Sequence, residues 1–424
     1  MGQAPAAPAR RLNVLLCPAG SAGDVHPFIG LGRALRDRGH DVTVVTSAYF
    51  EDLVRRAGLR SAPVGTAEQF EEVTRDPRVW PPYTGFIHLI RHIVPLLRPA
   101  FAALDRLLVP PRTVVAAPLL LAAAARLFAE ARRVPLATLH LQPMAFLSVQ
   151  RPPHSISWIH ERTPHVLRRL VLRLADGAVD RVIGPDLNGL RRELGLPPLR
   201  RVLTRWATSP DRVIGLFPKW FAQPAPDWPP QTRLTGFPLY DEADTTGVPD
   251  GLEAFLQAGE APIVFAPGSA NRFGRGFFEA GLDACRRLGR RGVLLTRHVE
   301  QVPHELPPQV RHFDYAPFSR LLPRAAALVH HGGIGTVAQG LAAGIPQLAM
   351  PTAFDQPDNA RRLEGLGVGR SLPSRRFRGP AVARELAGLL ESGDVAARCC
   401  EVAQRMREGS PVEETCELIE ELAP

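Results

Sequence analysis

One segment of the 424-residue chain, residues 325 to 359, restricts the possible folds more than any other. It opens with an apolar run, Ala325 to Val329, which is typical of a strand buried in a parallel sheet. Glycines follow at once, and from Thr336 the pattern becomes helical. A second apolar strand is expected from Ile345 to Met350. A strand, a glycine turn, a helix and another strand predict an α/β fold with a doubly wound parallel sheet.

The glycine turn has the composition of a phosphate-binding site. The first turn of a helix leaves N–H groups unpaired and carries about half a positive charge, so it attracts anions. Glycines allow a phosphate to approach the backbone closely, and a histidine side chain adds a donor. The residues assigned to phosphate on this ground are His331, Gly332, Gly333, Gly335 and Thr336.

Asp355 and Gln356 follow the second strand, at the sheet edge where ligands of open α/β sheets bind. A carboxylate and an amide suit the hydroxyl groups of a sugar. Because they come about twenty residues after the phosphate donors, the pattern predicts a nucleotide diphosphate-sugar as ligand.

The offsets within this segment resemble the donor signature of inverting glycosyltransferases with the GT-B fold. The residues that carry the resemblance are His331, Gly333, Thr336, Gly344, Ile345, Pro346, Asp355, Gln356 and Asn359. Four further segments resemble one bacterial branch, the rhamnosyltransferase-like enzymes that glycosylate hydroxylated lipids: residues 20–46, 76–80, 215–229 and 234–242. The resemblance implies two Rossmann-like domains with an interdomain cleft, transferase activity and no cofactor.

The resemblance also implies donor contacts from other loops. Gly268 and Ser269 match the family's phosphate-side turn, although a plain turn is the alternative. Tyr315 and Phe318 stand where relatives carry a base-stacking aromatic and a ribose-binding amide; Tyr315 can still stack, but Phe318 cannot hydrogen-bond. Gln339 replaces a glutamate that binds ribose in uridine-diphosphate enzymes. This exchange favours deoxythymidine diphosphate, while both nucleotides stay candidates.

The loop after the first predicted strand, Asn13 to Pro18, holds the candidate catalytic group. Its glycine spacing does not fit a dinucleotide fingerprint, and Thr46 ends the second strand where an acid would be needed, so nicotinamide binding is not expected. Many relatives carry a general-base histidine at the position of Asp24, and some antibiotic glycosyltransferases use an aspartate there. Asp24 is therefore the predicted base. The alternatives are His26 as the base, and a capping role for Asp24 at a helix starting near Pro27.

Strand and helix patterns alternate in both halves of the chain. We expect an acceptor-binding domain over residues 1–225, a linker rich in Pro, Asp and Thr over 226–250, and a nucleotide-sugar domain over 251–424. In the resembled fold the last helix usually crosses back to the first domain. The middle stretch, residues 151–210, is helical and carries arginines beside a leucine-rich face.

The composition, 45% hydrophobic and 22% charged, is that of an ordinary globular protein. No apolar run approaches the roughly 20 residues of a membrane span, and the apolar stretch from Leu12 to Cys17, after a short polar tail, is too short for a signal peptide. Five cysteines, odd in number and without metal spacing, are typical of a reduced cytoplasmic protein.

Charge is spread unevenly. Residues 1–225 hold 30 basic and 17 acidic side chains, hence +13, whereas the remainder holds 21 and 25, hence −4. A basic half is compatible with a solvated face, with peripheral contact at the inner face of the membrane, or with nucleic acid. The chain contains no zinc pattern and no basic motif with interleaved aromatics, so a nucleic-acid partner is not expected.

The predicted function is inverting transfer of a hexose or deoxyhexose to a hydroxyl of a hydrophobic acceptor. No D-x-D triplet is present, so no metal is expected and the helix terminus must stabilise the leaving group. Apolar residues of two expected loops, 86–97 and 141–158, indicate the acceptor groove: Phe86, Ile87, Leu89, Met144, Phe146, Leu147 and Trp158. Two alternatives remain, a non-catalytic protein that binds a nucleotide-sugar for a partner enzyme and a nucleotide-sugar epimerase.

Overall fold

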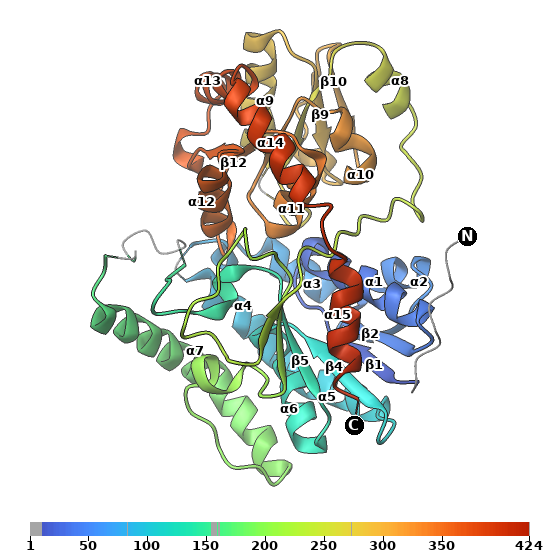
Figure 1. Ribbon diagram of the computed structural model, residues 1–424, viewed down its shortest axis with the longest axis vertical. Coiled ribbons are helices and arrows are strands. Elements are labelled where there is room, and N and C mark those ends of the chain that lie inside the picture. Colours follow the sequence, from blue (N-terminus) through green and yellow to red (C-terminus); the bar gives the residue numbers. More distant parts are fainter. Residues whose placement is uncertain (1–10, 83, 154–158, 160–161, 273, 424) are drawn as a thin grey trace. The chain divides into compact units, whose positions relative to one another are not determined.

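A computed structural model describes residues 11–82, 84–153, 159, 162–272 and 274–423. Contacts between residues divide the chain into two units (Figure 1). Unit 1 comprises Met1–Pro238 together with Ser410–Pro424, and unit 2 comprises Leu239–Gly409. Each unit holds one parallel sheet, which confirms the doubly wound α/β prediction.

Unit 1 has a seven-stranded sheet in the order β3-β2-β1-β4-β5-β6-β7. Its strands are β1 (Asn13–Leu16), β2 (Asp41–Ser47), β3 (Arg60–Val64), β4 (Thr113–Ala117), β5 (Leu136–His140), β6 (Arg212–Gly215) and β7 (Thr232–Leu234). Its α-helices are α1 (Ala22–Asp37), α2 (Glu51–Arg56), α3 (Ala67–Arg75), α4 (Gly85–Ile93), α5 (Leu97–Arg106), α6 (Ala123–Arg132), α7 (His165–Glu193) and α15 (Pro411–Glu420).

Unit 2 has a six-stranded sheet in the order β10-β9-β8-β11-β12-β13. Its strands are β8 (Ile263–Ala266), β9 (Gly292–Leu295), β10 (Val310–Phe313), β11 (Ala327–His330), β12 (Gln347–Ala349) and β13 (Gly369–Ser371). Its α-helices are α8 (Leu252–Gln257), α9 (Arg275–Leu288), α10 (Phe318–Leu321), α11 (Ile334–Ala343), α12 (Gln356–Leu366), α13 (Gly379–Leu390) and α14 (Gly393–Arg405).

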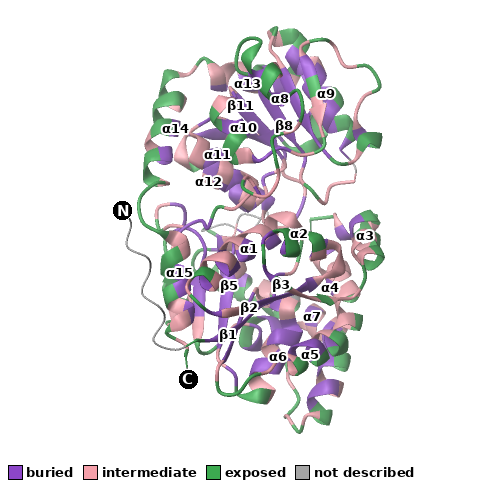
Figure 2. Cartoon of the chain, turned by 90° about the vertical axis from the view of Figure 1, so that its right-hand side faces the viewer, coloured by how far each residue is buried: buried purple, intermediate pink, exposed green. Residues whose placement is uncertain are grey.

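The central strands of both sheets are buried throughout (Figure 2), as expected for parallel strands covered by helices on both faces. In unit 2 the strand order reverses between β8 and β11, where Ile263 pairs with Ala327 and Ala266 pairs with His330. The loops that follow β8 and β11 therefore leave the sheet side by side. Such a reversal point is where open α/β sheets bind ligands.

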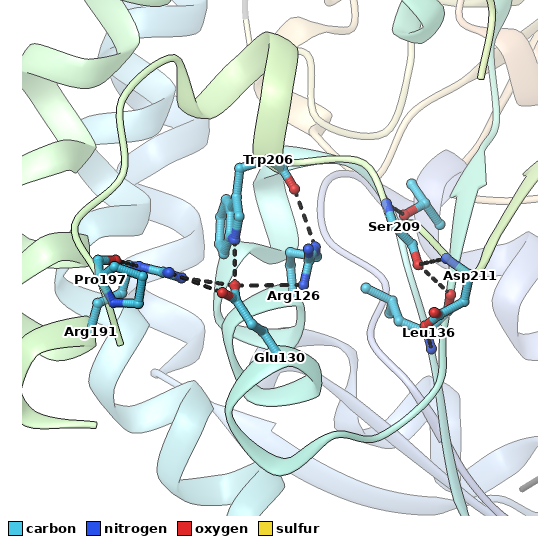
Figure 3. Close-up of polar contacts among 9 residues, drawn as sticks. Arg126, Glu130, Leu136, Arg191, Pro197, Trp206, Ser209 and Asp211 are labelled. Carbon is cyan, nitrogen blue, oxygen red and sulfur yellow. Dashed lines mark hydrogen bonds and ion pairs between the residues drawn. The ribbon is translucent and has the colours of Figure 1, made fainter. Parts of the chain in front are cut away.

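Helix α7 is anchored to unit 1 through its C-terminal half. The buried guanidinium of Arg191 donates to both carboxylate oxygens of Glu130, on α6, at 2.8 and 2.9 Å. Glu130 also accepts from Trp206 Nε1 at 2.6 Å (Figure 3). Because the buried charge is paired and doubly hydrogen-bonded, this cluster fixes α7 against α6.

The structure differs from the predicted elements at three places. Helix α1 begins at Ala22 and contains Pro27 as its sixth residue, where the missing N–H removes one intrahelical hydrogen bond. Residues 86–97 are not a loop but lie in α4, a 3₁₀ turn and the start of α5. Helix α11 begins at Ile334, two residues before the predicted Thr336.

One helical stretch of the described residues, Gly85–Arg106, is long and apolar enough to span a membrane. By these two criteria, length and apolar composition, the expectation that the chain holds no such stretch was wrong. Ile90, Leu97 and Phe101 of this stretch belong to the buried core of unit 1. A core helix passes the same test, so the finding is weak support for a span.

Candidate functional site

The turn between β11 and α11 presents backbone donors with no side-chain cap. Gly332 has φ of +92°, a conformation that glycine adopts without strain. Gly333 is the N-cap residue, and its carbonyl accepts from the N–H of Val337 at 3.0 Å. The N–H groups of the three preceding helical residues, from Ile334 to Thr336, have no intrahelical acceptor, as in any first turn. The end of α11 is therefore able to bind an anion.

The imidazole of His331 lies between two glycines of this site. A Cβ atom built on Gly268 would stand 2.8 Å from the ring, and one built on Gly333 would stand 2.4 Å from its Nε2. Both positions therefore need glycine while the ring stays in place. Burial lowers the pKa of His331 to about 4, and a hydrogen bond to the backbone of Ala266 opposes this shift. His331 is therefore neutral at pH 7, and its Nε2 is the ring nitrogen nearest to Gly333.

His330 is a core residue. It is fully buried at the end of β11, and its Nδ1 accepts the N–H of Gly332 at 3.0 Å, which holds the glycine turn. Burial lowers the pKa of His330 to about 3, His331 lowers it further, and the side chain of Gln347 acts in the opposite direction. A neutral imidazole that accepts at Nδ1 carries its proton on Nε2.

The start of α12 is joined to the same turn. The Nδ2 amide of Asn359, which is fully buried, donates to Gly332 O at 2.9 Å and to Asp355 Oδ2 at 2.6 Å. Gln356 Oε1 accepts from the N–H and hydroxyl of Thr352, both at 2.9 Å, and from Ala353 N at 3.1 Å. Because this oxygen already accepts three hydrogen bonds, Gln356 can serve a ligand only as a donor through Nε2.

The loop after β8 is a turn in which the N–H of Asn271 donates to Gly268 O at 3.2 Å. Gly268 has φ of +102°, and Ser269 is exposed. Gln301 secures the end of the loop, since it accepts from Gly274 N at 3.0 Å and donates to Asn271 O at 2.8 Å. The side chain of Ser269 is thus available at the edge where His331 lies.

The three residues assigned to the nucleoside differ in their surroundings. The guanidinium of Arg297 lies 5.2 Å from the ring centre of Tyr315, whose hydroxyl donates to Asp241 O. Burial raises the pKa of Tyr315 well above its usual range. Phe318 begins α10 and packs against the apolar core of the unit. Gln339 is half-buried on α11.

Asp24 in unit 1 occupies the third position of α1. Its Oδ2 accepts from Ser21 N at 2.7 Å and from Ser21 Oγ at 2.9 Å, so the carboxylate caps the helix start. Burial raises the pKa of Asp24, and the bonds from Ser21 oppose this effect. A carboxylate with a raised pKa is a stronger base, so capping and proton transfer are compatible. His26 lies two residues further along the same helix and is half-buried.

Several residues expected to line an acceptor groove pack into the core instead. Phe86, Ile87 and Leu147 pack against the buried cluster of unit 1. Phe146 is buried and stacks on Trp228, with ring centres 3.8 Å apart. Leu89 and Met144 are half-buried, and Trp158 lies outside the described residues. These side chains contribute to the core of unit 1. An apolar sequence pattern alone cannot distinguish core packing from ligand binding.

The structure thus brings together most of the residues assigned to the sugar diphosphate, around the ends of β8, β11 and β12. Sequence reasoning placed Asn359 in the donor signature without giving it a contact, and it left out Thr352; both side chains hold the loops of the site in place. The contact between Asn359 and Asp355 could have been predicted, because residues four positions apart lie on the same face of a helix.

Comparisons with known proteins identify the family of the chain. Residues 14–139 match the glycosyltransferase family 28 N-terminal domain, and residues 290–422 match the C-terminal domain of erythromycin biosynthesis protein CIII-like proteins. The chain is 30% identical to O-mycaminosyltylonolide 6-deoxyallosyltransferase of Streptomyces fradiae, covering 97% of this chain and 98% of that protein. It is also 30% identical to glycosyltransferase GtfC of Amycolatopsis orientalis, covering 85% of this chain and 86% of that one.

Solved structures share the fold at lower identity. The glycosyltransferase of kitacinnamycin superposes with a TM-score of 0.76 at 22% identity, over 98% of this chain and all of that one. The spinosyn rhamnosyltransferase SpnG complexed with thymidine diphosphate gives 0.67 at 17% identity, over 96% of this chain and all of that one. The chain belongs to the GT-B glycosyltransferases that use nucleotide diphosphate-sugars, with a family 28 N-terminal domain and an erythromycin CIII-like C-terminal domain.

Proposed function

We propose that this glycosyltransferase moves a hexose or deoxyhexose from a dTDP- or UDP-sugar to a hydroxyl of a hydrophobic acceptor, a lipid or a natural-product aglycone, with inversion at the anomeric carbon. The observation that carries the donor assignment is the ring of His331, whose Nε2 lies next to Gly333, the N-cap residue at the uncapped start of α11. A diphosphate would supply the acceptor that both groups need.

In this mechanism the acceptor hydroxyl gives its proton to the carboxylate of Asp24 while its oxygen forms a bond to the anomeric carbon. The bond from that carbon to the β-phosphate oxygen breaks on the opposite face, and its electron pair leaves with the nucleotide diphosphate. The first N–H groups of α11 and His331 would stabilise the charge that develops there. No step of this mechanism requires a metal ion, so chelation by EDTA should leave the rate unchanged.

The sugar would be held by Asp355 and by the Nε2 amide of Gln356, since Gln356 Oε1 is already used within the chain. Gly268 and Ser269 would contact the phosphates from the β8 side, and Gly335 and Thr336 from α11. Tyr315, Phe318 and Gln339 remain the proposed surroundings of the nucleoside. Phe318 would contribute contact area alone, because its side chain has no hydrogen-bonding group.

Two relatives bear on the acceptor. One is named as acting on O-mycaminosyltylonolide, and the other, a sterol 3-beta-glucosyltransferase of Arabidopsis thaliana, is 27% identical over 85% of this chain and 58% of that protein. The two names give O-mycaminosyltylonolide and a sterol as the acceptors of those proteins. We therefore assign unit 1 to a hydrophobic, hydroxylated acceptor, with Asp24 as the base and His26 as the alternative base.

Thermal-shift titration tests the donor. Saturation at 100 times the dissociation constant stabilises a protein by about 2.7 kcal/mol. UDP and dTDP should raise the melting temperature of the wild type, GDP and ADP should not, and His331→Ala should weaken the response. His304→Ala, which removes an exposed histidine of the same unit, is the matched control and should behave as wild type. An undiminished response in His331→Ala would contradict the site.

Asp24→Asn separates an enzyme from a non-catalytic binding protein. An enzyme with Asp24 as its base should lose turnover while keeping its affinity for the nucleotide. A binding protein would show no turnover in the wild type with any panel of donors and hydroxylated apolar acceptors. Interconversion of the donor sugar without an acceptor would favour an epimerase instead.

A further inference from the structure

The N-terminal half of α7 presents an apolar surface to solvent. Val166 and Leu174 are 77% and 65% exposed, and Leu167 and Leu170 are also exposed. Val166, Leu170 and Leu174 recur every four residues, so they lie on one side of the helix, and Leu167 borders them. We call these four residues the α7 stripe. Half of the exposed large hydrophobic residues in the described chain belong to it.

The opposite side of the same helical turns is fixed to unit 1. Arg168 is buried and donates through one nitrogen to Val149 O at 2.7 Å and to Gln150 O at 3.1 Å. Asp176 is buried and accepts from Thr204 N at 3.0 Å. Further along, Arg191 binds Glu130 (Figure 3). Because these bonds set the rotation of α7 about its axis, the stripe is held outward and cannot turn into the core.

Positive charge accompanies the stripe. Arg169 and Arg173 are exposed and flank it on one side, and neither forms an ion pair with any described residue. From residue 162 to residue 175 the chain contains four arginines and no aspartate or glutamate. An outward apolar face bordered by arginines, with no acid within that stretch, matches the interface of an anionic bilayer.

We propose that the N-terminal half of α7 docks on an anionic phospholipid surface. The α7 stripe would enter the boundary between headgroups and acyl chains, and Arg169 and Arg173 would bind lipid phosphates while their methylene stems lie along the apolar layer. The helix would lie parallel to the surface, since its other side is occupied by unit 1. This binding is independent of the sugar donor and of Asp24.

A second copy of the chain fits the stripe less well. Pairing two copies through this face would bring together two stretches that both carry arginines and hold no acid to neutralise them. An anionic membrane supplies negative charge to both arginines at once. Charge therefore selects the lipid surface over self-association, and the oligomeric state in solution provides an independent check.

Co-sedimentation of the full-length protein with vesicles tests the proposal. Vesicles of phosphatidylcholine with about 30% phosphatidylglycerol should bind the wild type, and vesicles of phosphatidylcholine alone should bind it at least about tenfold more weakly, with binding to the mixed vesicles reduced at high salt. The double variant Leu170→Glu/Leu174→Glu should lose about tenfold or more of the binding, since each leucine contributes its transfer into the apolar layer. Both side chains are exposed, so the melting temperature should stay that of the wild type.

Val299→Glu, which alters an exposed apolar residue of unit 2, is the matched control and should bind as the wild type does. Arg169→Gln/Arg173→Gln should weaken binding to anionic vesicles and leave the small binding to neutral vesicles unchanged. The proposal is overturned if the wild type does not bind, or if the double leucine variant binds equally well, because charge alone would then account for it. It is also overturned if the wild type is a dimer that the double leucine variant converts to a monomer.

Discussion

The side-chain amide of Asn359 reaches from α12 to the carbonyl oxygen of Gly332, 27 residues earlier, and donates to it at 2.9 Å. The same nitrogen donates to Asp355 at 2.6 Å. One buried amide therefore fixes the glycine turn, the proposed phosphate site, relative to the carboxylate proposed to hold the sugar.

Asn359→Asp should destabilise unit 2 by about 3 kcal/mol, because it puts a carboxylate next to Asp355 and leaves Gly332 O without a donor. Calorimetry should show the loss as a lower melting temperature. Gln404→Glu makes the same change of charge at an exposed position of α14 and should shift stability by less than about 0.5 kcal/mol. Equal stabilities of the two variants would mean that the Asn359 contacts contribute nothing.

Asp24→Asn should reduce kcat by about 10²–10⁴-fold if the carboxylate is the general base. The amide oxygen can still accept from Ser21, and neutralising a carboxylate whose pKa is raised by burial removes an energetic cost. The free energy of unfolding should therefore be unchanged or slightly higher. If Asp24 only capped the helix, turnover would not fall while stability was kept. Asp37→Asn, exposed at the far end of α1, serves as the control.

Ser21→Ala should move the acid limb of the pH–rate profile to higher pH. The bonds from Ser21 lower the pKa of Asp24, so removing the hydroxyl lets the pKa rise further, and the base is protonated at a higher pH than in the wild type. The measurement is kcat/KM against pH. An unmoved limb would assign it to another group, such as His26.

Unit 2 should lose stability as the pH falls from about 6.5 toward 4. The folded-state pKa values of His330 and His331, about 3 and 4, lie below the ordinary value of 6.5, so the unfolded chain binds more protons over this range and stability rises with pH. His331→Gln should flatten the dependence measured by denaturant unfolding. A dependence of the same steepness in this variant would show that His331 does not titrate as its burial implies.

Nucleotide binding should raise the pKa of His331, which burial lowers in the free protein. A diphosphate beside the ring favours the imidazolium and raises the pKa of His331, so complex formation at about pH 6 should take up protons and tighten as the pH falls. Calorimetric titration in buffers of different ionisation enthalpy measures the uptake. His331→Asn should bind without it, whereas His304→Ala should match the wild type.

Much of the fold can be predicted from the apolar runs of the sequence. The runs at 13–16 and 263–266 are apolar almost throughout because parallel strands are covered on both faces, and the structure has them as β1 and β8. Short edge strands such as β7 and β13 escaped notice, since three residues that are mostly half-buried carry no periodic signal. Pro27 suggested a helix start because proline is common there, but Ser21 and Asp24 form the actual start, with Ala22 as the first helical residue.

The site could be predicted in part, for a physical reason. The glycines could be recognised from their residue type, because only glycine permits a phosphate to approach the backbone so closely. His331 could be recognised because its side chain can donate a hydrogen bond to a phosphate. The use of Gln356 Oε1 by Thr352 and Ala353 could not be foreseen, since it depends on how a loop folds back on a helix start. The apolar residues near 86 and 146 were ambiguous for a similar reason, because packing and acceptor binding call for the same side chains.

The chain returns from unit 2 to place α15 against α1, where Glu420 pairs with Arg38 at 2.6 Å. Within unit 1, Thr235 and Thr415 hydrogen-bond at 2.9 Å, so the segments that leave and re-enter the unit run next to each other. In the order of the chain, unit 2 is a domain inserted into unit 1 between Pro238 and Ser410. Chimeras that exchange the whole of unit 2 between relatives therefore need two chain junctions, after Pro238 and after Gly409, whose flanking segments in unit 1 already contact each other.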